Sequence, residues 1–362
     1  MLNKLTSVQH LRGVAAVLVV MSHAIGALLA HNWAGPVSTA LVGWGRVGVD
    51  IFFVISGFVM VLTTAEKPQG AATAIDFVKA RAIRIAPLYW ILTTLMVLFL
   101  LLAPGLFGSN KFDWQHAIAS YLFLPSTNRF TGSWMPVLPP GWTLTYEALF
   151  YAVFASLLLL PKRSMIVPSA AIFFVALSLA SLLPISVNQA FTTITDPIML
   201  EFVFGCIIGL LYTMRVKVPT LVSALAVAVG SIGILMTIGS DFQEFRRTAF
   251  MGVPSAFLVA GAVFLERNGW WLRLSVLCSI GDSSYSLYLG HVFALPLIIK
   301  ILLTIGAKAH LPGDLACVIM VASSVIAGYL LYLFLERPLT RKTQAWLKRP
   351  SHATRATPIS IG

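Results

Sequence analysis

Apolar residues along this chain are gathered in long runs that short polar connections separate. A helix that crosses the apolar core of a bilayer needs about 20 such residues in a row, and ten runs approach that length. They cover, approximately, residues 8–30, 46–64, 84–102, 142–160, 165–183, 196–214, 219–238, 249–265, 284–306 and 313–335. The pattern predicts an all-α fold, a polytopic membrane helical bundle of about ten transmembrane helices with no soluble domain.

The connections between the runs carry the residues that end helices and face water. Most are short, such as Glu66-Lys67-Pro68 and Arg215-Val216-Lys217. The longest, residues 103–141, contains a partly apolar stretch from Trp114 to Leu124, which is too short to cross a bilayer. Two placements fit this stretch: it lies in the membrane interface, or it dips back into the membrane.

Composition supports the membrane assignment and excludes other classes. Of the 362 residues, 58% are hydrophobic and only 10% are charged, against roughly 25% charged residues in a soluble domain. The net charge of +12 would suit nucleic acid if one basic domain carried it, but the basic residues lie between the apolar runs. We therefore expect membrane lipid as a partner and no nucleic acid.

The cysteines show no sign of a metal site. Cys206, Cys278 and Cys317 are far apart and lie in or beside apolar runs. Their spacing is unlike that of zinc ligands, so we interpret them as packing residues and expect no metal.

The basic residues also predict the orientation in the membrane. Ten crossings place both termini on one side, and the larger share of Lys and Arg falls on that side, including the tail from Arg337 to Arg355. Cytoplasmic loops carry an excess of these residues, so we predict that both termini are cytoplasmic. Lys4 before an apolar stretch resembles a signal peptide, but Arg12 and His23 interrupt that stretch. We therefore expect an uncleaved first helix.

Arg12 and His23, inside the first predicted helix, are candidates for function. They are eleven positions apart, which places them within about 20° of each other around a helix and ~16 Å apart along it. Charged groups within a membrane span are costly and usually face the bundle interior or water. A structural interpretation stays open for each residue, because Arg12 can reach cytoplasmic headgroups and His23 can bond a neighbouring helix.

Asp50 and Glu147 are predicted to lie at a depth similar to that of His23, in the outer half of the membrane. A carboxylate bonded to one imidazole nitrogen raises the basicity of the other. Asp50 is therefore a candidate to orient His23 as a general base, and Glu147 a candidate third member of the cluster. In the alternative, Asp50 lies at a helix end near water, and Glu147 pairs with Arg46 or another cation.

Two further groups of residues stand out. Arg81 and Arg84 share one helical face at the predicted cytoplasmic boundary, where guanidinium groups suit phosphates but equally suit lipid headgroups. Tyr285, Tyr288 and His291 share a face of the ninth predicted helix. We expect a neighbouring helix to satisfy the hydrogen bonds of His291.

Together these residues resemble the acyltransferase-3 family of integral membrane O-acyltransferases. Arg12 and His23 match its R-x10-H pattern, and Gly48 to Phe58 resembles its G-V-D-hydrophobic-F-F-x-x-S-G-F block. The remaining matches are Arg81 to Pro87 with R-x-x-R-I-x-P, Trp142 to Glu147 with W-[ST]-L-x-x-E, Ser284 to His291 with S-Y-[SG]-h-Y-x-x-H, and Glu336 to Pro338 with E-[RK]-P. Each pattern alone is weak, but six in the family's order along nearly the whole chain are strong. The closest likeness is to bacterial exopolysaccharide O-acetyltransferases.

The resemblance implies an enzyme of the bacterial inner (cytoplasmic) membrane that transfers an acyl group, usually acetyl, from cytoplasmic acetyl-CoA to a carbohydrate hydroxyl. The acceptor would be an exopolysaccharide or a lipid-linked oligosaccharide. Residues 1–336 would form the membrane acyltransferase domain, and residues 337–362 a basic cytoplasmic tail.

In this interpretation the six candidate site residues divide into two groups. His23, Asp50 and Glu147 serve catalysis, whereas Arg12, Arg81 and Arg84 bind the acyl-CoA. Two roles for His23 stay open, a general base or a nucleophile that is itself transiently acetylated.

Two other classes of function stay open on the residues alone. A proton-coupled transporter also buries His, Asp, Glu and Arg in its helices, but it more often shows inverted repeats, and this sequence shows no repeat. A lipid-linked sugar flippase or polymerase could also be basic and polytopic, without needing the paired R-x10-H and R-x-x-R patterns. The family resemblance favours the enzyme.

Overall fold

The computed structural model describes residues 5–102, 111–183, 188–240 and 242–347. Within these ranges the chain is helical and contains no β-strand, which confirms the all-α prediction. The helices of the first half are α1 (Thr6–Ala30), α2 (Pro36–Ala40), η1 (Trp44–Arg46), α3 (Val47–Thr64), α4 (Ala71–Leu102), α5 (Trp114–Tyr121), α6 (Gly141–Leu157), η3 (Arg163–Met165) and α7 (Ile166–Ala180).

The second half continues in the same manner. Its helices are α8 (Gln189–Thr195), η4 (Pro197–Met199), α9 (Leu200–Thr213), α10 (Thr220–Leu235), α11 (Glu244–Arg247), η5 (Thr248–Gly252), α12 (Val253–Arg267), α13 (Ser275–Asp282), α14 (Ser284–Thr304), η6 (Ala307–Ala309), α15 (Gly313–Leu331), η7 (Tyr332–Glu336) and α16 (Arg337–Leu347). Four basic residues that enter the orientation prediction lie outside the described residues, namely Lys4, Lys348, Arg349 and Arg355.

The ten predicted apolar segments all fall on helices. Eight helical stretches within the described residues have the length and hydropathy to cross a membrane. The other two segments correspond to α6, with 17 residues, and α10, with 16 residues. These two helices are about 24–26 Å long, slightly less than the ~30 Å apolar core of a bilayer. The polytopic bundle is therefore confirmed, and ten is an approximate count of its crossings.

Helix α4 is longer than the sequence pattern predicts. It has 32 residues and begins at Ala71, whereas the apolar run begins near Arg84. Apolar residues mark only the part of a helix that lies in lipid, while Ala, Lys and Arg before it favour the same helix in water. Arg81 and Arg84 thus lie within one continuous helix of ~48 Å rather than before its start.

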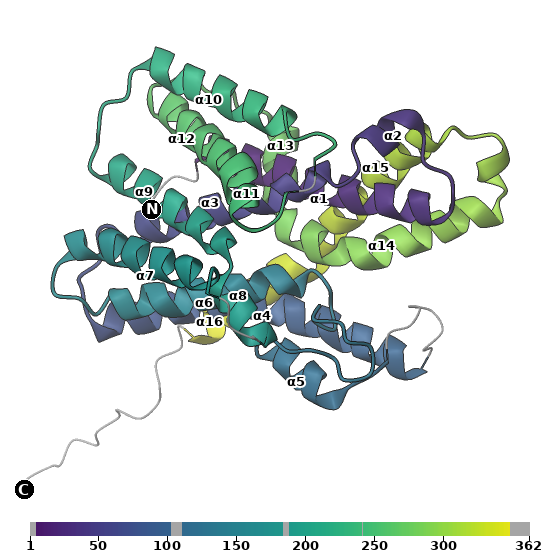
Figure 1. Ribbon diagram of the computed structural model, residues 1–362, viewed down its shortest axis with the longest axis horizontal. Coiled ribbons are helices and arrows are strands. Elements are labelled where there is room, and N and C mark those ends of the chain that lie inside the picture. The colour runs from purple at the N-terminus through teal and green to yellow at the C-terminus, as the bar shows by residue number, and fades with distance from the viewer. Residues whose placement is uncertain (1–4, 103–110, 184–187, 241, 348–362) are drawn as a thin grey trace, which may run out of the picture.

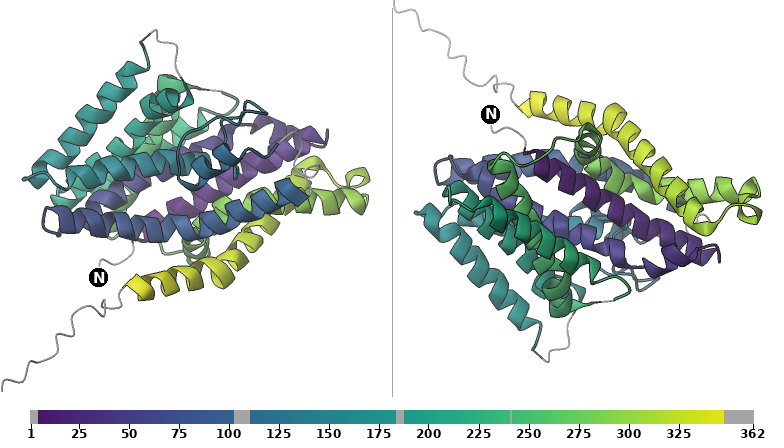
Figure 2. Two further views of the ribbon diagram at one scale, coloured as in Figure 1. Left: turned by 90° about the horizontal axis from the view of Figure 1, so that it is seen from below. Right: turned by 90° about the horizontal axis from the view of Figure 1, so that it is seen from above.

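The helices form three groups around α1 and α3 (Figure 1). Helix α10 packs on α12, α14 packs on α15, and α6 packs between α4 and α7. In both views of Figure 2 the described chain begins and ends at the same end of the molecule. An even number of crossings gives this arrangement.

Glycine residues allow α3 and α9 to approach closely. A Cβ atom at Gly57 of α3 would lie 2.0 Å from the carbonyl oxygen of Phe202, and one at Gly205 of α9 would lie 2.0 Å from that of Val54. Such small residues let the backbones of membrane helices meet. A larger side chain at either position would force α3 and α9 apart.

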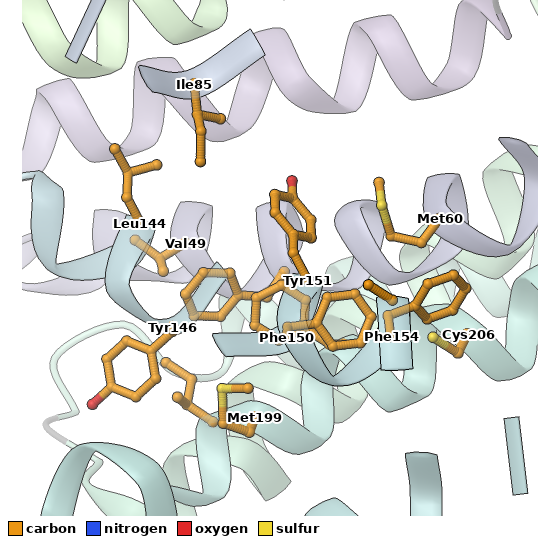
Figure 3. Packing of buried hydrophobic residues seen from close by; sticks show 14 of the residues in the cluster. Val49, Met60, Ile85, Leu144, Tyr146, Phe150, Tyr151, Phe154, Met199 and Cys206 are labelled. Atoms are coloured by element: carbon orange, nitrogen blue, oxygen red, sulfur yellow. The ribbon is translucent and has the colours of Figure 1, made fainter. Parts of the chain in front are cut away.

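An aromatic core fills the space between α3, α6 and α9. The ring of Phe202 stacks on Phe53 and on Phe150, each at 4.5 Å between centroids. Figure 3 shows Phe150, Tyr151 and Phe154 in this core, with the hydroxyl of Tyr151 pointing away from the other two rings. Tyr151 belongs both to the core and to the lining of a cavity, so packing of the core fixes one wall of that cavity.

The described part of the longest connection packs against α4. Tyr89 donates to the carbonyl oxygen of Ser120 at 3.1 Å, and Trp90 donates to that of Tyr121 at 2.8 Å. Asp113 begins α5 by accepting from the backbone of Gln115. Hydrogen bonds from the backbone and side chain of Arg129 lower the pKa of Asp113 to about 2. With eight residues, α5 is too short to cross the membrane.

Candidate active site

A cavity of about 130 Å³ lies between α1, α3, α4, α6 and α14. Its lining is largely apolar and aromatic, and Figure 3 labels five of the residues concerned, Val49, Met60, Ile85, Leu144 and Tyr151. The charged residues of the lining are Arg12, Arg81, Arg84 and Glu147. The structure therefore brings together four of the six predicted site residues, from three different helices.

The three arginines of this cavity use few of their hydrogen-bond donors. Arg12 Nη2 donates to Ser284 Oγ at 2.9 Å, and Arg81 Nη2 donates to Thr63 Oγ1 at 3.4 Å. Within the described residues, Arg81 Nε is buried without a partner, and Arg84 donates no hydrogen bond. Because each guanidinium carries five N–H groups, most of these donors are unused.

The charges of the cavity favour an anion. Arg12 lies near Arg84, which repels it, and near the carboxylates of Glu336, Asp282 and Glu147, which attract it. Three cations line the cavity against one carboxylate. A ligand with several negative charges, such as a phosphate group, would relieve the repulsion and accept charge-assisted hydrogen bonds.

Glu147 is held by hydroxyl groups rather than by a cation. Its Oε1 accepts hydrogen bonds from Tyr151 on the same helix and from Ser56 of α3, the latter at 3.1 Å. The alternative in which Glu147 pairs with Arg46 is not what the structure shows. A carboxylate fixed by two hydroxyls can face the cavity without neutralising its arginines.

His23 lies outside the cavity lining, beside α14. Its ring is 4.7 Å from that of His291, and Arg12 also contacts α14 at Ser284. The two residues therefore meet the same helix, as their spacing predicts. Tyr288 connects the two regions, because it lines the cavity and its ring is 6.2 Å from His291.

The sequence predicts that a neighbouring helix satisfies the hydrogen bonds of His291, and this prediction is wrong. Within the described residues, neither ring nitrogen meets a partner on a neighbouring helix, although the side chain is only 1% exposed. The backbone of Leu287 and Tyr288, on the same helix, lies beside the ring. The other polar residues near the start of α14 do have partners. Ser284 binds Arg12, Tyr285 donates to the carbonyl oxygen of Ile85 at 2.5 Å, and Ser286 donates to Glu336 at 2.6 Å.

Asp50 pairs with Arg247 rather than with His23. Its two oxygens accept from Arg247 Nε at 3.2 Å and Nη2 at 3.1 Å, and its side chain is fully buried. The reason lies in the face of α3 that meets α1. Gly48 lies on that face, because a Cβ atom at Gly48 would lie 2.2 Å from the carbonyl oxygen of Ala15 on α1. Asp50 is two residues further on, about 200° around the helix, and so points away from α1.

Sequence reasoning missed the buried cluster that surrounds Asp50. Neither Arg247 nor Glu201 is among the candidates that the sequence pattern singles out. Glu201 is fully buried beside Asp50 and Arg247, and neither of its oxygens meets a donor within the described residues. The signal that could have found it is the same one that selected Asp50, a lone carboxylate inside an apolar run.

Within the described residues, no group of three or more His, Cys, Asp and Glu side chains is arranged to hold a metal ion. Cys206 and Cys317 are buried, and Cys278 is partly buried beside His10.

Comparisons with known proteins identify relatives over almost the whole chain. A family model described as an acyltransferase domain matches residues 5–335. The exopolysaccharide production protein ExoZ of Rhizobium meliloti (strain 1021) is 38% identical over 304 residues, which cover 83% of this chain and 91% of that protein.

Two further relatives are less similar to this chain. The acyltransferase MdmB of Streptomyces mycarofaciens is 25% identical, with 93% of this chain and 92% of that protein covered. The peptidoglycan O-acetyltransferase OatA of Listeria monocytogenes is 23% identical, with 92% of this chain and 56% of that protein covered. No solved structure matches this chain.

Proposed function

The chain belongs to the acyltransferase family that matches residues 5–335, and from this premise we propose that it transfers an acetyl group from cytoplasmic acetyl-CoA to a hydroxyl of an exported polysaccharide or its lipid-linked precursor. It is a multi-pass membrane acyltransferase. The observation that carries the finer proposal is the cavity in which Arg12, Arg81 and Arg84 present unused donors.

The donor would bind through its phosphates. Coenzyme A carries several phosphate groups, and guanidinium forks bind phosphate more tightly than they bind water. Arg84 lines the cavity, and within the described residues the buried Nε of Arg81 lacks a partner. These two residues, with Arg12, would hold the phosphates, while the apolar lining would accept the pantetheine arm.

His23 would act on the acceptor. Its Nδ1 lies 2.9 Å from the carbonyl oxygen of Val19, and since a carbonyl only accepts, Nδ1 carries the hydrogen of the neutral ring. The Nε2 lone pair is then free to take the proton of the acceptor hydroxyl. The acceptor oxygen bonds to the acyl carbon, the carbon–sulfur bond breaks, and the proton passes to the thiolate.

Glu147 and Asp50 would have different roles. Glu147 lines the cavity beside the arginines, where it can orient the acceptor or the acyl group. Asp50 is bound on both oxygens by Arg247, so we assign it to fixing α3 against the segment that carries Arg247 rather than to direct contact with His23.

The acceptor class rests on the relatives. One is named for exopolysaccharide production and another as a peptidoglycan O-acetyltransferase. A carbohydrate hydroxyl is common to both, so we infer a polysaccharide acceptor for this chain, in the cytoplasmic membrane of a bacterium.

Replacing Arg84 with Ala is expected to weaken the binding of coenzyme A about ten- to a hundredfold, because a hydrogen bond to a charged group contributes about 1.5–3 kcal/mol. Lys at the same position should restore only part of the affinity, since a point charge does not reproduce the fork. Calorimetry of purified protein with coenzyme A measures both variants, and Arg81→Ala provides a second test.

The matched control is Lys79→Ala, on the same helix but exposed and outside the cavity lining. Its affinity should equal that of the wild type. If Lys replaces Arg84 without loss and Ala changes only the amount of protein in the membrane, the arginines serve membrane orientation. Unchanged affinity in both Ala variants would remove the donor site from this cavity.

An epitope tag fused to either terminus should be protected from added protease in intact cells. The same tag should be digested by the protease in inside-out vesicles. The ten crossings predicted from the sequence would place both ends on one side, and the excess of Lys and Arg on that side predicts the cytoplasm. Western blotting against each tag provides the measurement. Cleavage of the C-terminal tag alone in intact cells would contradict the even count.

A further inference from the structure

A second pocket lies where α9 and α12 end and α10 begins. Its volume is about 680 Å³, and its lining consists of Arg215 to Thr220 together with Arg267 and Asn268. Arg215, Lys217 and Arg267 are cations, and none of the described residues that line the pocket is a carboxylate. The sequence predicts that this end of the three helices is cytoplasmic. The pocket shares no lining residue with the candidate active site, and its charge favours an anion.

Arg267 is held in one orientation at this pocket. Its guanidinium lies over the ring of Tyr212, 3.7 Å from the ring centroid, and its Nη2 donates to the carbonyl oxygen of Tyr212. Its Nη1 is buried and has no hydrogen-bond partner within the described residues. Most buried donors in proteins have a partner, and one without a partner is costly. An acceptor bound in the pocket would supply that partner to a guanidinium that is already fixed.

The carboxylate next to Arg267 in the chain has other partners. Glu266 accepts from the backbone N–H of Thr6 at 2.7 Å, from that of Ser7 at 2.8 Å, and from the Ser7 hydroxyl at 2.5 Å. These bonds hold the start of α1. Within the described residues, none of the three lining cations forms an ion pair, so the pocket keeps its positive charge.

Apolar side chains exposed beside the pocket indicate which kind of anion fits. Helix α10 packs mainly on α12 and buries few of its residues, and Figure 1 shows this pair at one edge of the bundle. Leu221, directly after Thr220 of the pocket, is 70% exposed, and Leu225, one turn further, is 55% exposed. An anion free in water gains nothing from such a surface, whereas acyl chains pack on it. A lipid whose chains cover Leu221 would have its headgroup at the pocket.

We infer that this pocket binds the phosphate headgroup of an acidic phospholipid in the predicted cytoplasmic leaflet. The phosphate accepts hydrogen bonds from Arg267 and is attracted by Arg215 and Lys217, while the acyl chains lie along the exposed side of α10. Basic pockets between membrane helices suit such headgroups. The inference does not depend on acyl transfer. It differs from a general attraction between basic loops and acidic lipid, which would need neither the pocket nor the fixed guanidinium.

Adding phospholipid to the full-length protein, purified in a neutral detergent, tests the inference. Phosphatidylglycerol should raise the melting temperature, because a ligand that binds only the folded state stabilises it. Phosphatidylcholine, whose phosphate is accompanied by a positive group, should have a much smaller effect. Titration of each lipid gives its apparent Kd. Equal stabilisation by the two lipids would overturn the inference.

Substitutions in the pocket locate the site. Arg267→Gln should weaken the binding of phosphatidylglycerol about ten- to a hundredfold, because a hydrogen bond to a charged group is lost. Lys217→Gln should weaken it about threefold, since this ammonium is exposed to water and surface ion pairs contribute little. The exposed position of Lys217 keeps the test available if Arg267→Gln cannot be purified. Unchanged affinity in the pocket variants would overturn the inference.

The matched control is Arg273→Gln, because Arg273 is exposed on the same predicted side and lies outside the pocket lining. Its affinity for phosphatidylglycerol should equal that of the wild type. A loss in Arg273→Gln as large as that in Arg267→Gln would indicate general attraction of basic loops and would overturn the inference.

Soluble phosphates distinguish a lipid from other ligands with the same chemistry. Inorganic phosphate should displace phosphatidylglycerol no better than sodium chloride of equal ionic strength, which controls for screening, because it brings no acyl chains. Displacement by phosphate beyond that level would assign the pocket to a free anion and overturn the lipid assignment. Arg267→Gln should bind coenzyme A like the wild type, since Arg267 lies outside the active-site cavity. Loss of coenzyme A binding in this variant would assign the pocket to the acyl donor instead of a lipid.

Discussion

Replacing His23 with Ala is expected to lower the turnover of acetyl-CoA with a carbohydrate acceptor by about 10²–10⁴-fold, the usual contribution of a general base. The bond from His23 Nδ1 to the carbonyl oxygen of Val19 leaves Nε2 as the proton acceptor. Alanine removes that acceptor, while the arginines of the cavity are untouched. Initial rates of coenzyme A release, measured with a thiol reagent on purified protein, give the effect directly.

The matched control is His31→Ala, eight residues further along the chain, because His31 is exposed and makes the same local hydrogen bond. It should keep wild-type turnover. Calorimetry should show that His23→Ala still binds coenzyme A with wild-type affinity, since His23 does not line the cavity. Near-normal turnover in His23→Ala would exclude both of the roles proposed for this residue.

The same protein separates the two roles. Incubation of the wild type with acetyl-CoA and no acceptor, followed by rapid quenching and mass spectrometry of the peptide that contains His23, would show an added acetyl group if His23 is a nucleophile. A general base forms no such adduct.

Replacing Arg247 with Ala is expected to lower the free energy of unfolding by about 3–5 kcal/mol, the cost of leaving a buried charge without its partner. Arg247 binds both oxygens of Asp50, whose side chain is fully buried while that of Arg247 is 15% exposed. Glu201, also fully buried, lies beside the same pair. Without Arg247, two carboxylates would share a site with no cation. Thermal or denaturant unfolding in detergent measures the loss.

The neighbouring Arg246 provides the control, because it is exposed and its guanidinium lies over the ring of Phe242, 5.4 Å from the ring centroid. Arg246→Ala should change stability by less than about 0.5 kcal/mol, as for other surface substitutions. An equal effect of the two variants would mean that the pairing with Asp50 does not stabilise the fold.

Asp50→Asn distinguishes the role suggested by the sequence from the role suggested by the structure. If Asp50 serves to hold Arg247, the substitution should reduce stability. The pH dependence of His23 modification by diethylpyrocarbonate, which reacts with neutral imidazole and is read by peptide mass spectrometry, should then be unchanged. If Asp50 orients His23, that pH dependence should change while the stability is retained.

Local sequence determined the helices, because each depends mainly on its own residues. A run of apolar residues must form its hydrogen bonds internally in lipid, so the ten segments follow from their composition. The shared face of Arg12 and His23 follows from the helical repeat, as does that of Arg81 and Arg84. These relations hold within one helix and need no knowledge of its neighbours.

The rotation of each helix against its neighbours came only from the tertiary structure. Depth in the membrane placed Asp50 and His23 at the same level, but the close contact of Gly48 with α1 turned Asp50 away toward Arg247. Similarly, hydroxyls rather than a cation hold Glu147, and His291 rather than Asp50 lies against His23. Membrane depth can be read along one helix, whereas partners depend on which faces the packing of small residues brings together.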